Sequence, residues 1–453
     1  GMSGIAEVLH NMGYGVSGSD LKDSSITQHL KSIGIEVFIG HAPSNVSAVD
    51  VVVYSNAVPD QNPEIIEAKK RMIPIIPRAE MLNELLRIKR GIGVSGTHGK
   101  TTTTSMISFI LNEARWDPTL IIGGILNTLS SNAHLGDGEF LVYEGCEAFG
   151  SINYFNSEIV VLTNIDNDHM EFYKSEEDLK EAFLNYINRI PFYGFAVLNG
   201  DDPKIQSILP QIRKKFYLFG FNSNNQIYAH HIQCRGFETT FQVSFLGQDL
   251  GVFELNVPGK HNIYNALAAI GVACNLGIEP SIIKKAMKNF VNANRRFQFI
   301  GEKDKVVVVD DYAHHPTEIA ATLDGAFQLK GENIKRVITI FQPHLYSRTQ
   351  LHYKNFAHSL ALSDFVFLAE IYPAREKPIQ GVSSALITET FKRIGYQNYS
   401  YTPSFEVILN QLESFLKPGD LVLTMGAGDI DQLGPQILAL LKNKKKEEVL
   451  LAI

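Results

Sequence analysis

The sequence predicts an α/β protein of three domains, and three observations lead to that prediction. Short runs of β-branched residues alternate with helical patterns along the whole chain, which is typical of helices packed on parallel sheets. The 453 residues exceed what one hydrophobic core usually supports. The sequence pattern changes near residue 88 and again near residue 294, which divides the chain into expected domains of residues 1–88, 89–294 and 295–453.

Composition and charge narrow the class of protein. A hydrophobic content of 45% and a charged content of 20% are those of an ordinary globular protein. The net charge is −7 and the one strong basic run, Lys442–Lys446, is expected to be a solvated tail, so we expect no nucleic acid partner. Three widely spaced cysteines indicate a reducing compartment. Because no apolar stretch has membrane-spanning length and no signal peptide opens the chain, we expect a cytoplasmic protein without a membrane partner.

The first segment carries short apolar runs separated by polar or helical stretches. We expect strands at Ile35–Ile39, Val49–Tyr54 and Ile73–Ile76. A charged stretch, Arg87–Arg90, then leads into the next apolar run, which places the first domain boundary near residue 88.

The middle segment opens with the most informative motif of the chain. An apolar run, Ile92–Ser95, is followed by Gly96, Thr97, His98, Gly99, Lys100, Thr101 and Thr102, and then by a helical pattern. Glycines let backbone N–H groups close on phosphate oxygens, and a helix N-terminus favours negative charge there. Lys100 would reach the terminal phosphates and the Thr101 hydroxyl would bind Mg²⁺. A threonine-rich helix cap is the alternative, but four consecutive threonines form helices poorly.

Two further strand ends in this segment carry acidic groups. The expected strand Glu158–Leu162 is followed by Thr163–His169, which could hold Mg²⁺ or could be a polar turn that caps a helix. The run Phe140–Tyr143 is followed by Glu144 and Glu147, which could complete a metal shell, while Cys146 and Phe149 are expected to pack.

A β-rich region, residues 215–257, is followed by two expected helices, Asn262–Leu276 and Ser281–Phe290. Asn262 and Asn265 are three residues apart and therefore share a helix face. Their amides could read an adenine edge, although capping of the helix by Asn262 fits the spacing better.

The last segment has the clearest alternation, with expected strands Val306–Val309, Val337–Ile340, Phe365–Leu368 and Leu421–Thr424. Each strand ends in polar or glycine-rich residues: Asp310–Asp311, Gln342–His344, Glu370 and Gly426–Gly428. Because ligands bind outside the carboxyl ends of the strands in open α/β sheets, we expect the chemistry of this domain at one rim. Arg348 is a natural clamp for a carboxylate.

Taken together, the motifs resemble the Mur ligase family, the ATP-dependent amide-forming enzymes of peptidoglycan precursor synthesis. The resemblance covers nearly the whole chain, through Gly1–Ala6, Arg78–Leu82, Gly96–Thr104, Thr163–His169, His261–Ala269, Arg295–Phe297, Asp310–Pro316 and Phe341–Thr349. It implies a Rossmann-like N-terminal domain that binds a UDP-sugar, a central P-loop-type ATPase domain, and a C-terminal Rossmann-like domain that brings the amino acid.

Within the family, the likeness is greatest to members that join L-alanine to UDP-N-acetylmuramate. The implied reaction uses ATP and Mg²⁺, passes through an acyl phosphate, and is carried out by a monomer or homodimer. The resemblance assigns catalytic roles to Lys100, His169, His314, His344 and Arg348, and metal contacts to Thr101, Glu147 and His169. It assigns nucleotide contacts to the residues of the loop 96–102 and to Asn262, Asn265, Arg295 and Asp311, and substrate contacts to Ser55, Arg78, Tyr312, His314, His344 and Arg348.

The chain departs from the family pattern in three places. It begins inside the Gly-rich turn that follows the family's first strand, so that strand is expected to be missing. The family's Glu-Ala-Asp-Glu-Ser-Asp is here Glu144-Gly145-Cys146-Glu147-Ala148-Phe149, and Leu345 stands where the family usually has Arg. Two alternatives therefore stay open: addition of a recycled tripeptide to the same nucleotide, and a nucleotide-binding paralogue without activity.

Overall fold

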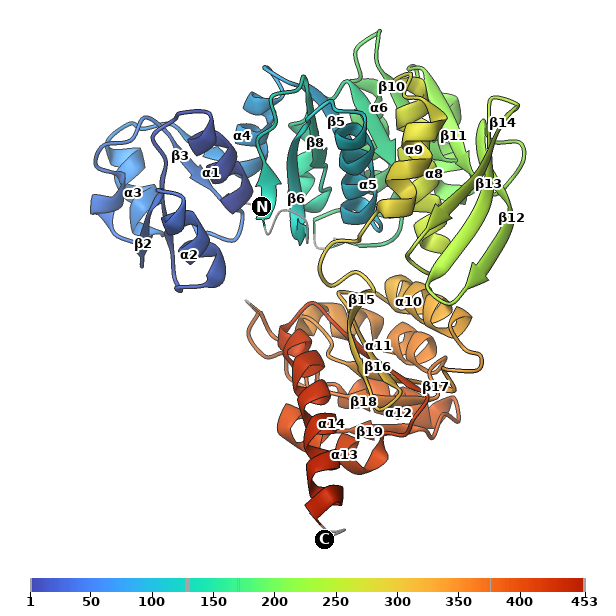
Figure 1. Ribbon diagram of the computed structural model, residues 1–453. Helices are drawn as coiled ribbons and strands as arrows, with labels where there is room; N and C mark the ends of the chain where they lie inside the picture. Colours follow the sequence, from blue (N-terminus) through green and yellow to red (C-terminus); the bar gives the residue numbers. More distant parts are fainter. Residues whose placement is uncertain (1, 127–130, 169, 171, 375, 451–453) are drawn as a thin grey trace. The chain divides into compact units, whose positions relative to one another are not determined.

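A computed structural model describes residues 2–126, 131–168, 170, 172–374 and 376–450 (Figure 1). The chain forms two compact units. The first contains residues 1–232, 241–254 and 263–291, and the second contains residues 233–240, 255–262 and 292–453. The prediction of an α/β protein is confirmed, because strands and helices alternate through both units.

The N-terminal segment of the first unit holds two separate pairs of parallel strands. β1 pairs with β2 and β3 pairs with β4. The strands expected in this segment exist but are shorter than expected, and β1 was missed because Ser17–Asp20 contains no apolar residue. The elements here are α1 (Met2–Asn11), β1 (Ser17–Asp20), α2 (Ser25–Ser32), β2 (Glu36–Ile39), η1 (Pro43–Val46), β3 (Val52–Tyr54), α3 (Pro63–Lys70), β4 (Ile75–Pro77) and α4 (Arg78–Leu85).

The rest of the chain up to residue 291 is built on one large sheet. Among the described residues its strand order is β14-β13-β12-β11-β10-β9-β5-β8-β6-β7. Its strands are β5 (Arg90–Ser95), β6 (Thr119–Leu126), β7 (Ser131–His134), β8 (Phe140–Glu144), β9 (Ile159–Leu162), β10 (Phe195–Asn199), β11 (Phe216–Gly220), β12 (Ile227–Arg235), β13 (Glu238–Phe245) and β14 (Gln248–Leu255). The helices between them are α5 (Lys100–Glu113), η2 (Ala148–Asn153), α6 (Glu176–Asn188), α7 (Pro203–Ile208), η3 (Leu209–Gln211), α8 (Lys260–Asn275) and α9 (Pro280–Asn289).

Strand β5 is the point at which the order of this sheet reverses. The chain runs from β5 through β6 to β8 on one side, then crosses to β9 and β10 on the other side. β5 pairs in parallel with both β8 and β9, so the carboxyl ends of these three strands meet at one edge. Ligands of open α/β sheets bind at such a switch point, and the residues after β5 are those of the predicted phosphate loop.

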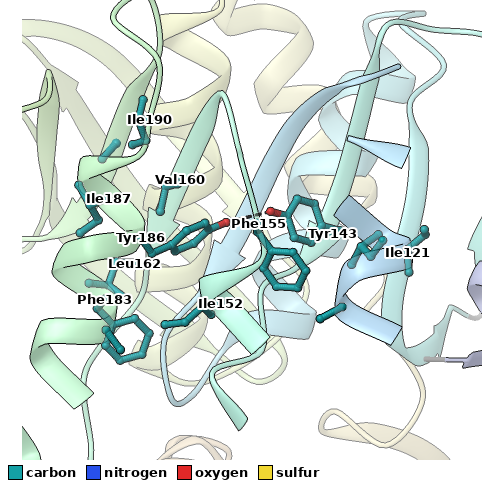
Figure 2. Packing of buried hydrophobic residues seen from close by; sticks show 14 of the residues in the cluster. Ile121, Tyr143, Ile152, Phe155, Val160, Leu162, Phe183, Tyr186, Ile187 and Ile190 are labelled. Atoms are coloured by element: carbon teal, nitrogen blue, oxygen red, sulfur yellow. Dashed lines mark hydrogen bonds between the residues drawn. The ribbon is translucent and has the colours of Figure 1, made fainter. Parts of the chain in front are cut away.

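A core on one face of the sheet joins α6 and η2 to the strands. Figure 2 shows the Tyr143 and Tyr186 hydroxyls pointing toward each other beside the Phe155 ring. Ser157 closes the set: its hydroxyl lies 2.5 Å from that of Tyr143 and 2.6 Å from that of Tyr186, and the two tyrosine hydroxyls are 3.0 Å apart. Because each hydroxyl can both donate and accept, all three are satisfied without water.

The second unit holds a six-stranded sheet of order β15-β16-β20-β17-β18-β19 over the described residues. β15 runs antiparallel to β16, and the remaining neighbours are parallel. The expected strands of this segment are confirmed, and the basic run expected as a tail continues the last helix. The elements are β15 (Gln298–Lys303), β16 (Val306–Asp311), α10 (Pro316–Gln328), β17 (Arg336–Phe341), α11 (Tyr346–Leu360), β18 (Phe365–Leu368), α12 (Ala385–Arg393), β19 (Tyr399–Tyr401), α13 (Phe405–Phe415), β20 (Asp420–Met425), η4 (Asp429–Gln432) and α14 (Leu433–Leu450).

In the part of the chain that the structure describes, no helix is both long and apolar enough to cross a membrane.

The hydroxyl cluster makes Gly93 of β5 sensitive to substitution. A Cβ at this position would lie 2.1 Å from the Tyr186 hydroxyl and 2.8 Å from that of Ser157. Gly93→Ala should therefore lower the free energy of unfolding by about 2 to 3 kcal/mol, measured by urea denaturation. Gly93→Ala with Tyr186→Phe should lose less than the sum of the two single changes, because the missing hydroxyl makes room.

Gly18 of β1 is the matched control, since a Cβ there meets nothing within 4 Å. Gly18→Ala should change the stability by less than about 0.5 kcal/mol. Equal losses for the two glycine variants would contradict the role given to Gly93.

Candidate active site

Two glycines give the loop after β5 its shape. Gly96 has φ 122° and Gly99 has φ 82°, both in the region that favours glycine. A Cβ on Gly96 would lie 2.3 Å from Thr163 Oγ1, and one on Gly99 would lie 2.4 Å from Asn265 Oδ1. The loop thus packs so closely that no side chain fits at either position, and α5 begins directly after it at Lys100.

The turn after β9 braces this loop. Thr163 Oγ1 donates to the His98 carbonyl at 2.6 Å, and Asn164 Oδ1 accepts from the His98 amide at 2.9 Å. His98 Nε2 lies 3.1 Å from the Asp166 carboxylate. The described residues of the predicted metal turn therefore hold the loop in place, while His169 lies outside the described residues.

Lys100 and Glu147 form a buried ion pair at the centre of the site. The Lys100 ammonium lies 2.9 Å and 3.1 Å from the two Glu147 carboxylate oxygens, and it donates to the Gly96 and Thr97 carbonyls at 2.5 Å and 3.0 Å. The Glu147 side chain is 1% exposed and that of Lys100 is 14% exposed. Burial opposes the charge of Lys100, but the acidic groups around it, first among them the Glu147 carboxylate, together hold the pKa of the lysine above its usual value.

The acidic stretch after β8 keeps one of its carboxylates at this centre. Glu144 turns to the neighbouring strand, where its carboxylate accepts from the Gly123 amide at 2.9 Å. Burial is the main cause that raises the pKa of the Cys146 thiol to about 11, and the Glu147 charge acts in the same direction. The thiol is therefore neutral near pH 7. Cys146 therefore adds no negative charge where the family pattern has an aspartate.

Phe149 does not pack, so the expectation for this residue is wrong. Its side chain is 41% exposed, and its backbone has φ 55° and ψ 26° inside η2. The Glu147 carbonyl accepts from the Tyr173 hydroxyl at 2.7 Å and from the Gly150 amide at 3.0 Å. These two bonds hold the turn that carries Phe149.

The two asparagines of α8 differ in their contacts. Asn265 Oδ1 accepts from Thr103 Oγ1 of α5 at 3.2 Å, which ties α8 to the helix that follows the loop. Asn262 lies inside α8, because the helix begins at Lys260, and its Nδ2 donates to the Pro258 carbonyl at 2.7 Å. The alternative in which Asn262 caps the helix is therefore wrong.

The four threonines, residues 101–104, are all buried in α5. Thr104 Oγ1 donates to the Lys100 carbonyl at 2.8 Å, four residues earlier. Burial of these side chains against the rest of the unit offsets the poor intrinsic helix propensity of threonine. Thr101 and Thr102, predicted to contact the metal and the phosphates, thus form the first turn of the helix.

Ser55 and Arg78 lie at one edge of the N-terminal segment. Each follows a strand of the β3–β4 pair, in which Tyr54 lies opposite Pro77. Arg78 is the first residue of α4, and its charge also acts on the Cys146 thiol. The structure therefore brings these two predicted substrate residues together.

The predicted residues of the second unit lie at the ends of parallel strands. β16, β20, β17 and β18 are parallel, so the residues that follow them lie at one edge of the sheet. Arg295 uses its guanidinium within this rim: it donates to the Asp310 carboxylate at 2.9 Å and to the Gly426 and Gly428 carbonyls at 2.6 Å and 3.0 Å. Asp311 accepts from the Phe297 and Ala313 amides at 2.7 Å and 2.8 Å. The nucleotide contacts assigned to Arg295 and Asp311 remain predictions.

Aromatic rings line the same rim. The His314 ring lies 5.1 Å from that of Tyr312 and 6.0 Å from that of His344, which in turn stacks on Tyr372 at 5.9 Å. Leu345 then turns the chain into α11 with φ 69°, and Arg348 lies in the first turn of that helix. The structure thus gathers Tyr312, His314 and His344, and Arg348 follows them in the first turn of α11.

Sequence reasoning missed Tyr173, whose hydroxyl holds the Glu147 turn and which no motif marks. Glu370, already expected at the end of a strand, accepts from the Ile371 and Ser384 amides at 2.8 Å and 3.1 Å. Asn164 lies within Thr163–His169, the turn already expected to be functional. The pairing of Lys100 with Glu147 joins residues that lie 47 positions apart, which periodicity does not reveal.

Comparison with known proteins identifies the family. Residues 1–90 match the model "Mur ligase family, catalytic domain", residues 94–273 match "Mur ligase middle domain", and residues 295–428 match "Mur ligase, glutamate ligase domain". The chain therefore belongs to the Mur ligase family. The three-domain α/β fold predicted from the sequence is that of the family.

Individual relatives are similar over nearly their whole length. The UDP-N-acetylmuramate–L-alanine ligase of Geobacter sulfurreducens is 48% identical over 447 residues, covering 98% of this chain and 96% of the relative. That of Lawsonia intracellularis is 44% identical, with 97% and 96% covered. Among solved structures, the UDP-N-acetylmuramate-alanine ligase of Thermotoga maritima has a TM-score of 0.81 at 28% identity, covering 98% and 97% of the two chains. A murein peptide ligase from Psychrobacter arcticus shares the fold, with a TM-score of 0.71 at 24% identity and 98% and 96% covered.

The buried carboxyl of Asp311 should make stability depend on pH. Burial raises the pKa of Asp311 from 3.8 to about 6, despite the Arg296 charge and the two amide donors. Between pH 3.8 and about pH 6 the Asp311 carboxyl is protonated in the folded protein and ionised in the unfolded chain. Its contribution to the free energy of unfolding therefore falls as the pH rises. From pH 4.5 to 7 the loss should be about 2 kcal/mol.

The measurement is urea denaturation of the wild type and of Asp311→Asn at both pH values. The difference in unfolding free energy, wild type minus variant, should be more favourable to the wild type at pH 4.5. A difference that is the same at both pH values would show that Asp311 is ionised in the folded state throughout.

Proposed function

We propose that this protein joins L-alanine to the carboxylate of UDP-N-acetylmuramate at the expense of ATP, in peptidoglycan precursor synthesis. The carboxylate takes the terminal phosphoryl group of ATP to form an acyl phosphate, and the alanine amine then displaces phosphate to form the amide. The observation that carries the proposal is the glycine-shaped loop at the switch point of the sheet, with a buried lysine at its centre. The names of the relatives that match over nearly the full chain support the same reaction.

Lys100 is the group that meets the phosphates. Its ammonium is held inside the loop by the Gly96 and Thr97 carbonyls. A small change in the side-chain conformation would direct the ammonium to phosphate oxygens bound by the loop amides. A fixed positive charge in a site shielded from water stabilises the charge that develops on the transferred group.

The residues present also fit a divalent cation. Glu147 offers a buried carboxylate and Thr101 a buried hydroxyl, both beside the phosphate loop, and oxygen donors of this kind suit Mg²⁺. Bound there with ATP, Mg²⁺ would neutralise the phosphate oxygens. Glu147 would then pair with the cation in place of Lys100.

Arg348, His344, His314 and Tyr312 are the proposed contacts for the amino acid. A guanidinium binds a carboxylate through two parallel hydrogen bonds, which suits the carboxylate of L-alanine. The rings of Tyr312, His314 and His344 lie together in the second unit. Imidazoles near the alanine amine can accept the proton that the amine loses when it attacks.

The first test compares amino donors. The protein is supplied with Mg-ATP, UDP-N-acetylmuramate and either L-alanine or the tripeptide L-alanyl-γ-D-glutamyl-meso-diaminopimelate, and phosphate release is followed. We expect release with L-alanine and little with the tripeptide. Release with the tripeptide alone would favour the cell-wall recycling activity, and release with neither would favour a paralogue without activity.

The second test separates the chemical role of Lys100 from its structural one. Lys100→Ala should lower turnover by at least about 100-fold. It should also lower stability by about 3 kcal/mol, because it leaves the buried Glu147 carboxylate without its cation. Lys100→Ala with Glu147→Gln should recover most of the stability but none of the turnover.

Lys180 provides the control, since it pairs with Glu176 at the surface of α6 at 2.7 Å. Lys180→Ala should leave turnover unchanged and stability nearly so. Substantial turnover by the double variant at Lys100 and Glu147 would contradict the function proposed for the loop.

A further inference from the structure

Two phenylalanine rings beside Glu147 face solvent. Phe149 is 41% exposed and Phe172 is 46% exposed. Other large aromatic residues of this unit, among them Tyr143 and Phe155, are fully buried. The exposure of Phe149 and Phe172 is therefore not explained by a lack of buried positions for aromatic side chains in this unit.

The backbone conformation at Phe149 is strained. Its φ of 55° lies in the left-handed region, where a residue with a Cβ is strained by about 1 kcal/mol, and the next residue, Gly150, has φ 67°. A Cβ on Gly150 would lie 2.8 Å from the Phe172 ring, so that ring lies directly over the turn. The bonds to the Glu147 carbonyl from Tyr173 and Gly150 keep the turn in this form.

The chemistry of the proposed substrate places its sugar close to this turn. The reacting carboxylate of UDP-N-acetylmuramate is attached to the sugar ring through a short lactyl ether. When that carboxylate meets the phosphoryl group held by Lys100, the ring must lie only a few bonds away. Glu147 is 2.9 Å from Lys100, and Phe149 follows it by two residues.

We propose that Phe149, with Phe172 beside it, forms a stacking surface for the sugar ring of UDP-N-acetylmuramate and so determines how tightly this substrate binds. The proposal rests on the function proposed above. One face of a pyranose ring presents C–H groups, which an aromatic plane can cover by burying apolar surface and through weak C–H contacts.

The test is a set of substitutions at Phe149. Phe149→Ala should raise the KM for UDP-N-acetylmuramate about five- to tenfold, while the KM values for ATP and L-alanine and the kcat stay within about twofold. Phe149→Tyr should keep the wild-type KM, because it retains the aromatic plane. Phe149→Leu, apolar but not planar, should resemble the alanine variant.

Two further variants separate stacking from a structural role. Phe149→Gly removes the strained φ, so it should keep or raise the melting temperature while it raises the KM for UDP-N-acetylmuramate. Phe192→Ala removes a ring that is 94% exposed after α6 and should change no kinetic constant. Titration calorimetry with UDP-N-acetylmuramate alone should give the same order of affinities as the KM values.

The outcomes separate this proposal from the function. If the wild type neither binds nor converts UDP-N-acetylmuramate, the proposed function fails. If the wild type is active and Phe149→Ala keeps its KM for that substrate, the stacking surface is ruled out while the function stands. An equal rise in the KM for ATP, or a wild-type KM for Phe149→Leu, would likewise overturn it.

Discussion

The geometry of the site depends on the buried pair of Lys100 and Glu147. A carboxylate that is 1% exposed is stable in its charged form only beside a cation, and a largely buried ammonium needs the carboxylate in turn. The pair fixes the end of β8 against the loop after β5. Because the pair is neutral as a whole, the proposed nucleotide and cation would replace both partners together without leaving a buried charge alone.

Around this pair, close packing sets where each chain segment can lie. Gly96 and Gly99 let the loop touch Thr163 and Asn265, and Gly93 lets β5 lie against the hydroxyls of Tyr143, Ser157 and Tyr186. These contacts come from β8, α6 and α8 and from the residues on either side of β9, all in the first unit. The position of the loop is therefore a property of the sheet and its helices together, whereas the groups assigned to the amino acid are positioned by the second unit.

The sequence predicted the features that are local. Strands β9, β16 and β20 contain continuous apolar runs, which are typical of parallel sheets covered on both faces. The glycines of the loop directly follow the shorter apolar run of β5. The sequence did not predict β1, whose residues Ser17–Asp20 carry no apolar signal. It also misplaced Phe149 in the core, because hydrophobicity alone cannot show that a turn of left-handed backbone directs a ring outward.

Cys146 has a consequence for the sensitivity of the site to oxidants. Thiolates react with peroxides, disulfides and alkylating agents far faster than thiols do. With a pKa of about 11, fewer than about one in a thousand of these groups is a thiolate at pH 7. A sulfur next to the proposed phosphate loop is thus kept almost entirely in its less reactive thiol form, so mild oxidation should reach the exposed Cys234 before it reaches this site.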